Sequence, residues 1–165
     1  MKVIQDVNEM KASAFLDAFG DVAEHSAWVA REAAGFRPFA NRDAMIKSFE
    51  RAVKAANRDA QLALVRAHPD LATKAGLTED SSKEQLGAGL TTLTAEEFAR
   101  FTALNDRYKQ RFGFPFIFAV KGATKHMILG SFSDRLNSEL ETEFEMAIAQ
   151  VCRIFRFRIE DRVAP

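Results

Sequence analysis

Apolar residues recur at three- and four-residue spacings along most of the chain, which is the repeat of an amphipathic helix. Phe15 and Phe19 begin one such face, and a second helix is expected over residues 22–34. Asn41 and Asn57 are placed to cap two more helices, because an asparagine side chain accepts a hydrogen bond from the free amides of a first turn. The N-terminal half is therefore predicted to be helical.

The C-terminal half shows the same signals. Thr94 and Glu97 have the spacing of a capping box, and the helix that they open should stop at Gly113. Thr124 can open another helix, and a long last helix is expected to reach about residue 161. Strand candidates are too few for a sheet, so the sequence predicts an all-α fold of roughly eight helices with short links.

Residues 114–120 are the one stretch that reads as extended. Pro115 within it lacks an N–H, and the backbone has no sheet to join. Its remaining amides and carbonyls must pair somewhere, and they are candidates to contact a flat, polar ligand. The alternative, which the pattern alone favours, is a buried apolar plug between helices.

Composition narrows the class of protein. The chain has 165 residues, 47% hydrophobic and 28% charged, which is most simply one domain over residues 1–165 with a substantial core. Lys+Arg and Asp+Glu both total 23, so no bulk charge indicates binding to nucleic acid or to an anionic membrane. A single cysteine excludes an intrachain disulfide, and no run approaches the ~18 apolar residues of a membrane span. A cytoplasmic protein is expected.

His68 is the leading candidate for chemistry. Pro69 should end the helix that Asn57 opens, because the residue before a proline is pushed out of the helical region. His68 shares the inward face of Leu64 and Val65, at a helix C-terminus where the macrodipole favours imidazolium. Such a histidine can act as an acid or a base near neutrality. For an isolated His-Pro pair, the commoner case is a structural histidine bonded to a carbonyl.

Glu84 is the second candidate. It stands three residues after Ser81, which is the spacing of a capping box, and spacing alone favours this structural role. The functional alternative presents the Glu84 carboxylate beside His68, across the intervening loop. Ser81 is compatible with both alternatives.

Arg158 is the third candidate, and helical geometry distinguishes it from Arg156. Projection of the last helix at about 100° per residue places Arg158 near the centre of the apolar stripe and Arg156 on the polar side. A buried arginine needs an anionic partner. That partner is either a protein carboxylate or a substrate carboxylate bound bidentately, and the sequence favours neither. A frayed last turn that leaves Arg158 in water is a third possibility.

Signals for cofactors are missing from the pattern. No spacing of His, Cys, Asp and Glu matches a zinc or iron site, and there is no Walker A or dinucleotide-binding motif. Cys152 lies mid-helix without a base nearby in sequence, which is typical of a buried, inert thiol. The sequence therefore predicts no metal and no cofactor.

The motifs together resemble one known family. They are residues 68–72 (His-Pro-Asp-Leu-Ala), 81–90, 112–117 and 135–139, and the Arg-x-Arg-Ile that ends at Ile159. In this order and at these spacings they closely resemble the 2-oxo-4-hydroxy-4-carboxy-5-ureidoimidazoline (OHCU) decarboxylases of urate breakdown. The resemblance spans nearly the whole chain. One departure is Phe155, where relatives often have alanine.

The resemblance implies a homodimeric, all-α carboxy-lyase that needs no cofactor and converts OHCU to (S)-allantoin and CO2. It carries catalytic roles onto His68 and Glu84. It places contacts with the small ureidoimidazoline substrate at Pro69, Ser81, Gln85, Phe116, Ile117, Phe118, Ala119 and Arg158. Two alternatives stay open: a helical binding module without catalysis, and an acid–base lyase or hydrolase acting on a related ureido compound.

Overall fold

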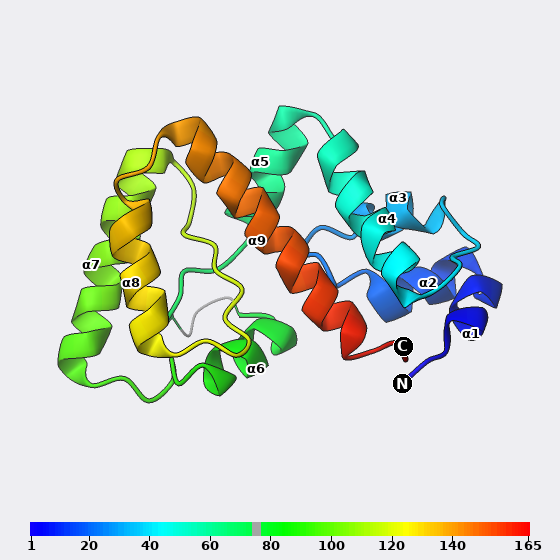
Figure 1. Ribbon diagram of the computed structural model, residues 1–165, viewed down its shortest axis with the longest axis horizontal. Helices are drawn as coiled ribbons and strands as arrows, with labels where there is room; N and C mark the ends of the chain where they lie inside the picture. The colour runs from blue at the N-terminus through cyan, green and yellow to red at the C-terminus, as the bar shows by residue number, and fades with distance from the viewer. Residues whose placement is uncertain (74–76) are drawn as a thin grey trace. The chain divides into compact units, whose positions relative to one another are not determined.

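Nine helices make up the fold that the computed structural model describes, over residues 1–73 and 77–165 (Figure 1). In chain order they are α1 (Ile4–Glu9), α2 (Ala12–Phe19), α3 (Trp28–Ala34), α4 (Arg42–Ala55), α5 (Arg58–Arg66), α6 (Glu79–Gly87), α7 (Ala95–Phe112), α8 (Lys125–Arg135) and α9 (Leu140–Glu160). Within the described residues, β-pairing is limited to an isolated bridge between Lys2 and Val163. The prediction of an all-α fold is confirmed.

The chain divides into two compact units. Unit 1 comprises residues 1–67 and 151–165, and unit 2 comprises residues 68–150. The boundary falls inside α9, so this helix contributes residues to both units.

Aromatic side chains form the core of unit 1. The Phe15 ring lies 5.1 Å from Phe19, 6.3 Å from Phe39 and 6.4 Å from Phe49, and Phe49 contacts Phe155 edge-on at 6.2 Å between ring centroids. Burial of such rings, each with a large apolar surface, is the main driving force for packing these helices. The apolar face predicted around Phe15 and Phe19 is therefore confirmed.

Local capping sets the ends of the helices in unit 1. Asn41 accepts a hydrogen bond from the Ala44 amide, and Asn57 accepts one from the Ala60 amide, each at 2.8 Å, as the sequence predicted. The helix expected over residues 22–34 begins only at Trp28. His25 has φ 47°, a left-handed conformation that a right-handed helix cannot include, so turns replace its expected first part.

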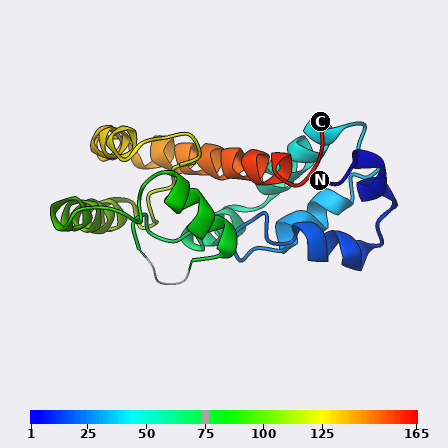
Figure 2. The same cartoon turned by 90° about the horizontal axis from the view of Figure 1, so that it is seen from below.

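Unit 2 is built around α7 and α8, which lie side by side (Figure 1, Figure 2). Phe132 of α8 contacts Phe101 and Tyr108 of α7, with ring centroids 6.1 and 6.3 Å apart. The capping box of Thr94 opens α7, and Gly113 ends it with φ 78°, both as predicted. The chain then continues through residues 114–120 without helix, as expected.

Candidate functional site

His68 directly follows the end of α5. The helix stops at Arg66 with Ala67 as its C-cap, so the predicted break before Pro69 is confirmed. The His68 side chain is buried, with 7% of its surface exposed. Its Nε2 atom makes no hydrogen bond to the described residues, although the residue interacts elsewhere. An imidazole in this position is shielded from bulk water, which suits controlled proton transfer.

Residues 68–72 form a turn that contacts α7 through two polar interactions. Lys109 forms an ion pair with Asp70 at 2.6 Å, and the Asn105 amide donates to the Leu71 carbonyl oxygen at 2.9 Å. The turn closes at Ala72, which has φ 64°. The non-helical segment after His68 therefore has a fixed path.

Helix α6 carries three of the predicted site residues, but it starts earlier than expected. Thr78 is its N-cap and accepts a hydrogen bond from the Ser81 amide at 3.2 Å. The expected capping box of Ser81 with Glu84 is therefore wrong, because Thr78 caps the helix three residues earlier and places Ser81 inside its first turn. Glu84 lies mid-helix and half-buried, and cap formation no longer explains its carboxylate.

Gln85 connects α6 to the His68 turn. It lies one helical turn after Ser81, and both side chains are buried, at 4% and 5% exposed. The Gln85 Oε1 accepts a hydrogen bond from the Ala72 amide at 3.0 Å. Two sequence segments that were predicted to share a site are thus joined directly within unit 2.

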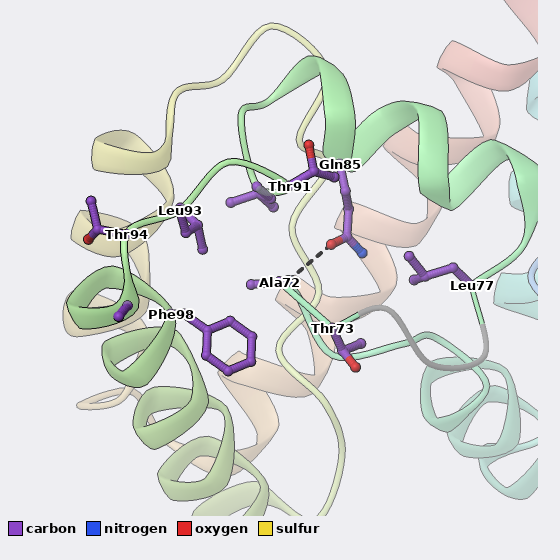
Figure 3. A pocket seen from close by; sticks show the side chains of 10 residues that line it. Ala72, Thr73, Leu77, Gln85, Thr91, Leu93, Thr94 and Phe98 are labelled. Carbon is purple, nitrogen blue, oxygen red and sulfur yellow. Dashed lines mark hydrogen bonds between the residues drawn. The ribbon is translucent and has the colours of Figure 1, made fainter.

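A cleft of about 530 Å³ lies beside this junction, and Gln85 is one of its walls (Figure 3). Most of the other walls are apolar or threonine side chains. The lining residues are Ala72, Thr73, Leu77, Gln85, Leu90, Thr91, Leu93, Thr94, Ala95 and Phe98. Of the predicted site residues, only Gln85 belongs to this lining.

The segment 116–119 is held by protein side chains. The Ile117 carbonyl accepts a hydrogen bond from Arg135 Nη1 at 2.6 Å, and the Ala119 amide donates to Gln150 Oε1 at 3.0 Å. Phe116 and Ile117 are buried, whereas Phe118 is half-buried. Part of the main chain that was expected to contact a ligand therefore has internal partners, as a buried segment between helices requires.

Arg135 is the centre of a buried polar network next to this segment. Its Nε donates to Glu143 Oε1 at 2.5 Å, and its guanidinium lies 4.3 Å from the centroid of the Phe116 ring. The Tyr108 hydroxyl donates a hydrogen bond to the same Glu143 oxygen. Burial, and then this bond to Glu143, raise the pKa of Tyr108 above its ordinary value, so the phenol stays protonated.

Arg158 lies in unit 1 and is 3% exposed, so the prediction from the helical projection is confirmed and the water-exposed possibility is wrong. Its Nη1 donates to Glu24 Oε2 at 2.8 Å and to the Val22 carbonyl oxygen at 3.2 Å. The protein-carboxylate alternative therefore describes its partner in this structure. Arg156 is half-exposed and pairs with Asp43 at 3.0 Å, which raises the pKa of Arg156.

Residues 1–73 and 77–165 were also compared with the features of metal sites, membrane spans and reactive thiols. These residues contain no group of three or more His, Cys, Asp or Glu side chains that could hold a metal ion. None of their helices combines the length and apolar character that crossing a membrane requires. Cys152 is buried, as predicted, and burial raises the pKa of its thiol to about 11, which suppresses the reactive thiolate.

Sequence reasoning missed Asn105, Tyr108 and Glu143, although periodicity contained a signal for each. Asn105 stands four residues after the buried Phe101 and three before Tyr108, on the apolar face of α7. Glu143 lies at the edge of the apolar stripe of α9, about 60° from Arg158 when the helix is projected. A polar residue on or beside an apolar stripe is therefore a candidate for a buried network.

Comparison with known proteins identifies a family. The family model described as OHCU decarboxylase matches residues 8–160 of the chain. This match includes most of both units and every predicted site residue.

Individual relatives agree with this match. The uric acid degradation bifunctional protein PucL of Bacillus subtilis is 44% identical over 98% of this chain, which spans only 33% of that protein. The 2-oxo-4-hydroxy-4-carboxy-5-ureidoimidazoline decarboxylase of Haloferax volcanii is 40% identical over 96% of this chain and 95% of its own length. A crystal structure of (S)-allantoin synthase matches with a TM-score of 0.80 and 28% identity, over 98% of this chain and 54% of that one.

Proposed function

The chain belongs to the OHCU decarboxylase family, and from this premise we propose that it converts OHCU to (S)-allantoin and CO2. The Haloferax relative is named for this decarboxylation, and this chain spans nearly all of it. The solved relative is named for the product, (S)-allantoin. We also propose that residues 1–165 act as one functional domain, and the family match, which runs through both units, supports this.

The observation that carries the proposal is the hydrogen bond between Gln85 and the Ala72 amide. It fixes α6, with Ser81 and Glu84, against the turn that begins at His68. The His68 imidazole and the Glu84 carboxylate thus come from two segments that a hydrogen bond joins. Fixed placement of reacting groups contributes much of the rate that enzymes achieve.

His68 and Glu84 are assigned the catalytic roles. In OHCU the bond between the carboxylate and a ring carbon breaks, and CO2 leaves. The electron pair forms a double bond to the neighbouring ring carbon, and the electrons of the C=N bond move onto the ring nitrogen, which takes up a proton from solvent. The same ring carbon bears a hydroxyl, which loses its proton to become a carbonyl, and the neighbouring carbon gains a proton. His68 transfers these protons, and Glu84 orients and polarises the imidazole. The substrate accepts its own electrons, so the reaction needs no cofactor.

Substrate binding is assigned to the remaining predicted residues. They are Pro69, Ser81, Gln85, main-chain groups of residues 116–119, and Arg158. Arg158 is assigned the substrate carboxylate because a guanidinium fork matches the geometry of a carboxylate. Bidentate binding of that carboxylate would orient the bond that breaks.

We also propose that the protein is a cytoplasmic homodimer. The chain carries 23 basic and 23 acidic residues, so its formal net charge of zero gives no net repulsion between copies. Light scattering on the purified protein tests this assembly, with twice the 18.4 kDa chain mass as the expected result. A single-chain mass would contradict the proposed dimer.

The function is tested by circular dichroism with substrate that is generated in situ. Urate oxidase and hydroxyisourate hydrolase generate the unstable OHCU from urate, and the optical signal of allantoin is followed with and without this protein. Rapid appearance of a signal for the S enantiomer is the expected result. Slow formation of racemic product, at the rate seen without the protein, would contradict the proposal.

Two variants assign the chemistry within that assay. His68→Ala should lower kcat on the order of 10²–10⁴-fold, because general acid–base catalysis is worth that much. Glu84→Gln should be folded but slow, since α6 is capped by Thr78 and does not need the carboxylate. A His68→Ala protein with the wild-type rate would remove the central assignment.

A further inference from the structure

Two side-chain amides hold one peptide group in the turn after His68. The Leu71 carbonyl and the Ala72 N–H belong to the same peptide unit. Asn105 of α7 donates to its oxygen at 2.9 Å, and Gln85 of α6 accepts from its nitrogen at 3.0 Å. Because a peptide group is rigid and planar, its orientation is set from both sides at once.

The backbone at this place is strained. Ala72 has φ 64°, in the left-handed region that residues other than glycine rarely enter. Such a conformation persists only when surrounding contacts impose it, and it is concentrated at functional sites. Here the imposing contacts are the bonds of Asn105 and Gln85 and the ion pair between Asp70 and Lys109 at 2.6 Å.

The peptide group in turn determines how Gln85 presents its amide. An N–H can bond only to the oxygen of the glutamine side chain, so the hydrogen bond from Ala72 fixes which end is Oε1. Figure 3 shows this oxygen directed to Ala72 with the nitrogen beside it. Because the Ala72 amide binds Oε1, the NH2 group is the end of Gln85 that can donate to an acceptor oxygen of a ligand.

Burial of Asn105 carries an energetic cost. It is 4% exposed, and its Oδ1 has no hydrogen-bond partner among the described residues. A buried amide oxygen without a partner disfavours the folded state, and this cost accompanies the hydrogen bond that Asn105 donates to the Leu71 carbonyl. Departures of this kind are expected where a residue serves function.

We propose that Asn105 is a positioning residue that acts through the Leu71–Ala72 peptide on Gln85. By holding the Leu71 carbonyl it keeps the Ala72 N–H directed at Gln85, and Gln85 thereby faces the substrate as a hydrogen-bond donor. The inference rests on the proposed decarboxylation for its substrate. Asn105 itself contacts no reacting atom.

The first test combines two substitutions in the optical assay. Asn105→Leu keeps the size but removes both the buried oxygen and the donor to the Leu71 carbonyl, and kcat/KM should fall on the order of 10²-fold in a protein that still unfolds cooperatively. The double variant with Gln85→Leu should be no slower than Gln85→Leu alone, because residues that act as a unit are not additive. Asp106→Ala, at an exposed position on the same helix, is the matched control and should behave as wild type.

The second test does not depend on activity. Hydrogen exchange at the Ala72 amide should be slow in the wild-type protein and in Asp106→Ala, and much faster in Asn105→Leu. Unchanged exchange in Asn105→Leu, or a fully additive double variant, would overturn the positioning role. If the wild-type protein proved inactive while the exchange result held, the decarboxylase proposal would fail and the link from Asn105 to Ala72 would stand.

Discussion

Each unit buries one arginine against one glutamate, yet the two pairs have different surroundings. In unit 1, Arg158 binds Glu24 at 2.8 Å and the Val22 carbonyl, both from the turn that precedes α3. In unit 2, Arg135 binds Glu143 at 2.5 Å and the Ile117 carbonyl at 2.6 Å. In both pairs, therefore, the arginine connects its helix to a stretch of chain without regular structure.

The difference lies in what else each pair holds. Glu143 also accepts from Tyr108, and Arg135 lies against the Phe116 ring, so four elements of unit 2 meet at one buried network. The contacts described for Arg158 join α9 to one turn. Burial of an ion pair thus does not by itself indicate its role, because the Arg135–Glu143 pair also belongs to a network with a tyrosine hydroxyl and an aromatic ring.

Removing one partner from each pair has the largest expected effect. Arg135→Met leaves Glu143 buried without its cation, and Arg158→Met does the same to Glu24, so each should lower the free energy of unfolding by about 3–5 kcal/mol. Urea denaturation measures both. Arg156→Met removes a half-exposed pair and should cost no more than about 1 kcal/mol. Equal losses for all three variants would remove the distinction between buried and surface pairs.

Tyr108→Phe tests whether the unit 2 pair is a network. The substitution keeps the aromatic ring and deletes only the hydroxyl that donates to Glu143. A hydrogen bond to a charged group contributes about 1.5–3 kcal/mol, so the free energy of unfolding should fall by that amount. A double-mutant cycle with Arg135→Met should be strongly non-additive. Additive losses would mean that Arg135 and Tyr108 act separately on Glu143.

Arg158→Lys tests whether the unit 1 pair also binds substrate. Lysine keeps the charge opposite Glu24 but lacks the planar fork that grips a carboxylate bidentately. KM should rise about tenfold, equivalent to about 1.4 kcal/mol, with a smaller change in kcat. Arg156→Lys, two positions earlier on the surface, is the matched control and should leave KM unchanged. An unchanged KM in Arg158→Lys would leave the arginine with a structural role alone.

The surface pair of Glu97 and Lys125 should show the smallest effect on stability. Hydrogen bonds from Lys125 and from the Thr94 backbone lower the pKa of Glu97 from 4.5 to about 2. Because the folded-state pKa is depressed, the stabilisation is present above about pH 4.5 and is lost as the pH falls toward 2. Melting temperatures measured across this window should converge for wild type and Glu97→Gln at the acid end. Curves that stay parallel would show that the pair adds nothing.

Local patterns were sufficient for much of the fold. Asn41, Asn57 and Thr94 cap helices as predicted, because a cap depends on residues only three positions away. The burial of Arg158 followed from helical periodicity alone. The start of α6 was misplaced because Thr78 and Ser81 are both good caps, and spacing does not rank them.

The site was less accessible to sequence reasoning. The family motifs indicated His68, Glu84 and Gln85, but not the contacts that hold them. Asn105 meets Leu71 across 34 positions and Tyr108 meets Glu143 across 35, and no local rule links residues so far apart. The left-handed Ala72 is equally hidden, because an alanine gives no sign of the contacts that force its backbone.

The bridge between Lys2 and Val163 has a practical consequence for engineering. Lys2 donates to the Arg162 carbonyl at 2.9 Å and accepts from the Ala164 amide at 2.8 Å, so the two end segments run next to each other in unit 1 (Figure 1). A short linker could join them covalently and leave the helices unaltered. New termini could then be opened at an exposed link between helices, giving circular permutants in which an attached fluorophore or tether no longer starts from these segments.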